Sequence, residues 1–155
     1  MRVRRISSRP RRGSSLVEAA IALPVALMFI LGTCVIGLGI YRYQQVASLA
    51  REGARYASVH GTQYASDTGN SAATGASIRS NAILPMAIGL NPNNLTSSVT
   101  WNTTNSPTSV NPNSTPPGWP LQNTVSVTVT YQWTPELYIS GPISLSSTST
   151  MPMSY

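Results

Sequence analysis

The stretch Arg11–Gly32, RRGSSLVEAAIALPVALMFILG, decides the fold, because a basic segment passes directly into a long apolar run. The run from Ala19 to Tyr41 contains 23 residues without a charged side chain. As an α-helix rising about 1.5 Å per residue, this run is roughly 34 Å long, against a hydrocarbon core of about 30 Å. The stretch therefore predicts a membrane-spanning helix over residues 14–41, with Glu18 at its entrance.

Positive charge is concentrated before the apolar run. The chain carries ten basic and four acidic residues and a formal net charge of +6. Six of the arginines lie in the first twelve residues: Arg2, Arg4, Arg5, Arg9, Arg11 and Arg12. Arginine is enriched on the cytoplasmic side of membrane helices, so we expect residues 1–13 in the cytoplasm and residues 42–155 outside. The basic composition thus indicates membrane topology and not nucleic-acid binding.

A glycine and a glutamate mark a candidate cleavage point at the entrance of the predicted span. If the chain is cut after Gly13, Ser14 becomes the first residue and Glu18 the fifth. A glycine before the cut and a glutamate five residues after it, followed by an apolar helix, resemble the prepilin processing signal of type IV pilins and their relatives.

The resemblance extends to a second block, VASLAREGARYA at Val46–Ala57. Together with RRGSSLVEAAIALP at Arg11–Pro24, this block resembles the TadE-like family, which comprises minor pilin-like proteins of the tight-adherence (Flp) pilus assembly system. Its most specific part contains the motif residues Arg51, Glu52, Gly53, Arg55 and Tyr56. Pilins of that system often have tyrosine after the glutamate, whereas this chain has Ala19, which fits a minor pseudopilin better than a major pilin.

The resemblance implies a role for each residue at the membrane entrance. A prepilin peptidase would cleave after Gly13, and Glu18 would pair with the new amine of Ser14, or with that of a neighbouring subunit, to help docking into an assembly. The implied partners are this peptidase, other pilus-assembly pseudopilins and inner-membrane platform proteins. The implied location is the inner membrane, with a single span and an extracytoplasmic domain.

Three alternatives remain open from the residues alone. The sequence LGTC at Leu31–Cys34 approximates a lipobox, which would make Cys34 an acylated N-terminus. The sequence SLA at residues 48–50 has small residues at a signal-peptidase spacing, which would leave Arg51 at the mature N-terminus. An uncleaved single-pass envelope scaffold or binding protein would retain Met1.

Helical spacing continues beyond the predicted span. The positions i, i+3, i+4, i+7 and i+11 are apolar or small: Val46, Leu49, Ala50, Gly53 and Ala57. We expect the span and this segment to form one rod from about Leu16 to Val59, ended by Gly61 as a C-terminal cap. A second helix is expected at Ser71–Ala87, with Ala72, Ala76, Ile83 and Ala87 on one face and Pro85 ending it.

Beyond the second helix the hydrophobic period changes to two. Apolar residues alternate with Ser and Thr over residues 95–101 and 125–133, and a third strand begins at Ile143 and Leu145. The predicted class is therefore α+β, with a long N-terminal transmembrane helix, a second helix and an antiparallel sheet of about three strands packed on the helical spine. Residues 102–121 contain five prolines and are predicted to form an exposed or partly disordered loop.

Residues 42–155 offer few groups for catalysis. They contain one histidine, His60, and no cysteine, and no pair of side chains stands at a metal-ligand spacing. Catalysis needs positioned acid–base or nucleophilic groups. We therefore predict a non-enzymatic protein that has no metal or cofactor and no small-molecule substrate.

Overall fold

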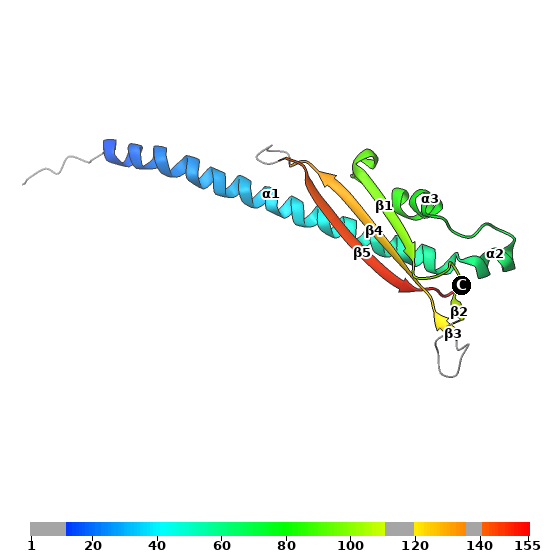
Figure 1. Ribbon diagram of the computed structural model, residues 1–155. Coiled ribbons are helices and arrows are strands. Elements are labelled where there is room, and N and C mark those ends of the chain that lie inside the picture. Colours follow the sequence, from blue (N-terminus) through cyan, green and yellow to red (C-terminus); the bar gives the residue numbers. More distant parts are fainter. Residues whose placement is uncertain (1–11, 111–119, 136–140) are drawn as a thin grey trace, which may run out of the picture. The chain divides into compact units, whose positions relative to one another are not determined.

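The computed structural model describes residues 12–110, 120–135 and 141–155, and the chain divides into two compact units, residues 1–38 and 39–155. Helix α1 spans Arg12–Val59 (Figure 1). Pro24 lies inside this helix. The predicted rod from Leu16 to Val59 is confirmed. Most of the predicted leader, residues 1–11, lies outside the described residues.

The second half of α1 carries the predicted buried stripe. Val46, Leu49, Ala50, Gly53 and Ala57 are all buried. Gly53 permits close packing, because a Cβ added there would lie 3.1 Å from Val127 Cγ1 and 3.3 Å from Ile83 Cδ1. Small residues on this stripe thus bring the helix near both the sheet and the second helical segment.

The structure corrects the prediction for Gly61. This residue has φ of −81° and is not a left-handed C-terminal cap; it stands before a further helix, α2, at Thr62–Thr68. Gly61 N–H donates to the carbonyl oxygen of Tyr155 at 3.0 Å, and a Cβ at Gly61 would collide with that oxygen. The glycine is therefore explained by the close approach of the C-terminus.

The second predicted helix is present but is divided. It comprises α3 at Gly75–Ile78, the π-helical segment η1 at Arg79–Ile83 and α4 at Leu84–Met86. Because Pro85 has no N–H to donate to the preceding turn, a wide turn before it is a physical expectation. The predicted face is partly wrong: Ala76 is exposed and Ala72 half-buried, whereas Ile78, Ala82, Ile83 and Ala87 are buried.

The predicted antiparallel sheet is confirmed. After the short 3₁₀ turn η2 at Pro92–Asn94, the strands are β1 at Leu95–Trp101, β4 at Thr124–Trp133 and β5 at Ile143–Pro152, in the spatial order β1-β4-β5 (Figure 1). The buried face of β4 has Val125, Val127, Val129, Tyr131 and Trp133. Its other face pairs hydroxyls across strands, as between Thr128 and Thr148 at 2.8 Å. The fold class is α+β, as predicted.

The predicted loop at 102–121 contains regular structure. Strands β2 at Thr108–Val110 and β3 at Pro120–Gln122 pair antiparallel, and residues 111–119 lie outside the described residues. The fully buried Asn123 holds the neighbouring turn: its Nδ2 donates to Thr104 Oγ1 at 3.0 Å and to the Ser106 carbonyl at 2.8 Å. Side-chain hydrogen bonds thus order a segment that has few apolar anchors.

Candidate functional site: an apolar groove with one carboxylate

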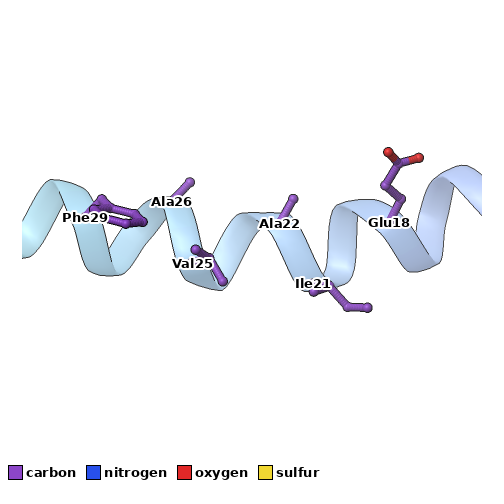
Figure 2. A pocket seen from close by; sticks show the side chains of 6 residues that line it. All are labelled: Glu18, Ile21, Ala22, Val25, Ala26 and Phe29. Atoms are coloured by element: carbon purple, nitrogen blue, oxygen red, sulfur yellow. The ribbon is translucent and has the colours of Figure 1, made fainter.

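A shallow apolar groove of about 530 Å³ runs along the first half of α1 (Figure 2). It is lined by Glu18, Ile21, Ala22, Val25, Ala26 and Phe29. The apolar side chains are open to the surroundings; Ile21 is 68% exposed and Phe29 is 74% exposed. This surface is therefore available to a lipid or to another helix.

One side of the groove follows from helical spacing. Glu18, Ala22 and Ala26 are four residues apart, so they lie on one face of α1, and Figure 2 shows them pointing to the same side. The two alanines form a small-xxx-small pair, which permits close approach of a second helix. Glu18 is the one charged residue that lines the groove.

The predicted cleavage point lies one turn before the groove. Gly13 is exposed within α1, and no atom lies within 4 Å of the position that its Cβ would occupy. Ser14 is also helical and stands four residues before Glu18, so the two positions share a helix face. Gly13, Ser14 and Glu18 thus lie within about one and a half turns of α1, and cleavage itself stays a prediction.

The first half of α1 has the dimensions of a membrane span. Within Ser15–Val59, an 18-residue window reaches a mean hydropathy of 2.5, and none of its residues is buried. Thr33 satisfies its hydroxyl within the helix by donating to the Phe29 carbonyl at 2.8 Å. Cys34 is an exposed free thiol on this segment. By its length and composition, this segment is able to cross a membrane.

The predicted family-motif residues divide between the core and the surface. Gly53 lies in the core, where an added Cβ would crowd the side chains of Val127 and Ile83. Arg51 and Arg55 are exposed, and Glu52 and Tyr56 are half-buried. The motif therefore places a close helix contact and a solvent-facing polar row on opposite sides of α1.

The segment that contains these features matches a family model. Residues 13–55 match the family model of TadE-like proteins. The TadE-like segment begins at the glycine of the predicted cleavage point and includes the whole groove and Gly53. No curated protein and no solved structure matches the chain. The TadE-like match and the apolar helix fit a membrane protein associated with the Tad pilus.

Residues beyond the TadE-like segment form a cleft that the sequence did not predict. Tyr56 and His60 stack at 4.0 Å between ring centroids, and His60 meets Tyr64 edge to face at 4.6 Å. The available signal was the spacing of these aromatic rings, each four residues after the last. The prediction that the helix ends at His60–Gly61 hid this spacing, because Tyr64 lies beyond that end, in helix α2, which was not predicted.

Proposed function

We propose that this protein is a membrane-anchored, pseudopilin-like component of tight-adherence pilus assembly that a prepilin peptidase cleaves after Gly13. The observation that carries the proposal is the groove that begins at Glu18, within the segment that matches TadE-like proteins. The N-terminus is cytoplasmic, residues 42–155 are extracytoplasmic, and the protein acts in the inner membrane by association and not by catalysis.

Cleavage would create a cation opposite the carboxylate. The new ammonium group at Ser14 would lie one helical turn from Glu18, at the end of a groove with otherwise apolar lining. A charge attraction is stronger in such low-dielectric surroundings than in water. Because buried ion pairs are weak stabilisers but define geometry, the pair would fix how far one subunit slides along the next.

The groove supplies the complementary packing surface. Helices in a lipid bilayer associate through close van der Waals contact, and small residues favour this contact. Ala22 and Ala26 supply the close approach, and Phe29 borders the groove. The proposed occupants are the apolar helices of other pilus-assembly pseudopilins or of inner-membrane platform proteins.

Intact mass measurement tests the processing step. When the full chain is produced with a prepilin peptidase, we expect a membrane-extracted protein that begins at Ser14. Gly13→Val should retain Met1, since it places a branched side chain at the cut. Retention of Met1 by the unsubstituted chain in the presence of active peptidase would instead favour an uncleaved single-pass scaffold or binding protein.

Co-purification tests the docking step. We expect Glu18→Ala to lower the yield of associated pseudopilins at least about fivefold, the loss of roughly 1 kcal/mol for one charged contact. Gln44→Ala is the control, because Gln44 is an exposed polar residue of α1 that neither lines the groove nor belongs to the family motif. Equal yields from both variants would show that the Glu18 carboxylate has no role in docking.

A further inference from the structure

A cleft lies within the unit formed by residues 39–155. It has a volume of about 390 Å³ and is formed by the end of α1, by α2, by the segment after α2, and by α3 and η1. None of its lining residues is an aspartate, glutamate, lysine or arginine. The volume is at the lower end of the range for small-molecule sites, about 300–1,000 Å³.

One wall of the cleft is aromatic and rigid. The rings of Tyr56 and His60 are nearly parallel, at an interplanar angle of 13°, and Tyr64 meets His60 at 61°. His60 Nδ1 lies 2.9 Å from the Tyr56 carbonyl oxygen, which fixes the imidazole on the helix. Aromatic rings of this kind combine an apolar body with a polar tip.

The polar groups of the cleft are held with bonding capacity to spare. Asn81 Nδ2 donates to the Tyr56 hydroxyl at 3.3 Å, and Asn70 Nδ2 donates to the Tyr64 hydroxyl at 3.1 Å. A phenol that accepts such a bond keeps its own hydrogen to donate. An amide oxygen has two lone pairs, so Asn81 Oδ1 can accept a further bond besides the one from the Ser80 hydroxyl at 3.3 Å. Each asparagine–tyrosine pair therefore presents a donor beside an acceptor.

This arrangement selects the chemistry of the ligand. The described residues that line the cleft include no carboxylate, ammonium or guanidinium group, so the cleft lacks the ionised side chains that bind phosphates, carboxylates or metal ions most strongly. A sugar hydroxyl both donates and accepts a hydrogen bond, and adjacent hydroxyls match a donor beside an acceptor. The C–H faces of a sugar ring are apolar and fit an aromatic wall.

We propose that this cleft, centred on Tyr56, His60, Tyr64, Asn70 and Asn81, binds a neutral saccharide. The amide–phenol pairs take the sugar hydroxyls, and the aromatic wall takes the ring. Saccharide binding does not require cleavage after Gly13, so this proposal and the proposed function can fail separately.

Saturation-transfer NMR on the full chain in detergent tests the site. The probes are neutral hexoses, N-acetylhexosamines and their disaccharides, with a blocked Ser-Asn-Gly peptide as the rival neutral ligand. We expect at least one saccharide to bind. Tyr56→Phe, which keeps the ring, and Asn81→Leu should each weaken that binding at least about fivefold, the effect of one lost hydrogen bond that leaves its partner unsatisfied.

Asn94→Leu is the matched control, because Asn94 is exposed and does not line the cleft. It should bind as the unsubstituted chain does. The proposal is overturned if no saccharide binds, if the peptide binds in place of the saccharides, or if Tyr56→Phe and Asn81→Leu bind normally. Circular dichroism establishes that each variant is folded; if Asn81→Leu unfolds, Tyr56→Phe decides alone.

Discussion

At the scale of single residues, Asn123 shows how a polar side chain replaces an apolar anchor. It is fully buried, its Oδ1 accepts from the hydroxyls of Thr103 and Ser109, and its Nδ2 donates twice. Its backbone also pairs, accepting from Met153 N–H at 2.8 Å. This one residue connects the turn before β2 with the C-terminal end of the chain.

We expect Asn123→Leu to lower the free energy of unfolding by about 2–3 kcal/mol, because it leaves several polar groups around the site without partners. Denaturant unfolding followed by circular dichroism measures the change. The same substitution at the exposed Asn94 should have an effect within about 0.5 kcal/mol. A similarly small effect at Asn123 would contradict the account of this network.

At the scale of elements, the small residue Gly53 lets α1 pack closely against β4 and η1. We expect Gly53→Val to lower the free energy of unfolding by about 1–3 kcal/mol, because added methyl groups would overpack against Val127 and Ile83. This cost outweighs the roughly few tenths of a kcal/mol gained by removing glycine from a helix.

Gly37→Val is the matched change on the same helix. No atom lies within 4 Å of the position of its Cβ, so stability should not fall. Thermal melts of both variants in the same detergent provide the comparison. Equal losses of stability would mean that the helix backbone, and not the contact at Gly53, sets the cost.

Elements with a strong local period could be predicted from the sequence. The stripe from Val46 to Ala57 predicts one buried helix face, and the alternation in β4 predicts one buried strand face. Both buried faces are confirmed. Helix α2 could not be predicted in this way, because it has no buried residue. It is held by distant backbone partners: Gly61 donates to Tyr155, and Thr62 donates to Asn105 at 2.7 Å.

The two candidate sites differ in the same respect. Only six residues span Gly13, Ser14 and Glu18, so the sequence alone places them close together. The saccharide cleft needs Tyr56 and Asn81, which are 25 residues apart and meet only after the chain has turned back. No local pattern encodes that meeting, although the aromatic spacing after Tyr56 was visible.

At the scale of the whole molecule, the last residue is tied to the helices. The Tyr155 hydroxyl donates to Asp67 Oδ2 at 2.7 Å, and its ring meets Tyr64 edge to face. The pKa of Tyr155 is raised from 10.0, first by this hydrogen bond, then by the negative charge of Asp67 and by slight desolvation. The protonated phenol is therefore the form that folding favours.

The hydrogen bond between Tyr155 and Asp67 makes the stability of the fold depend on pH. The stabilisation from this tie is fully present below the unfolded pKa, near 10, and is lost as the pH rises through the higher folded pKa of Tyr155. We expect Asp67→Asn to bring that pKa back towards 10.0 and to reduce the alkaline loss of stability. The effect is small and decreases with salt, since the pair is exposed.

Difference titration of phenolate absorbance between the unsubstituted chain and Tyr155→Phe isolates this group, and melting temperatures across the alkaline range report stability. An unchanged Tyr155 titration in Asp67→Asn would show that the carboxylate does not act on the phenol.

The three-stranded sheet has a chemical consequence for the environments in which the protein can work. Its strands β1, β4 and β5 contain no carboxylate, imidazole, ammonium or guanidinium group; their polar face is built from serine, threonine and glutamine. Hydroxyl pairs such as Ser126–Thr150, at 2.7 Å, neither ionise in acid nor attract counterions. We therefore expect the hydrogen bonds between these side chains to depend little on acidic pH or on ionic strength.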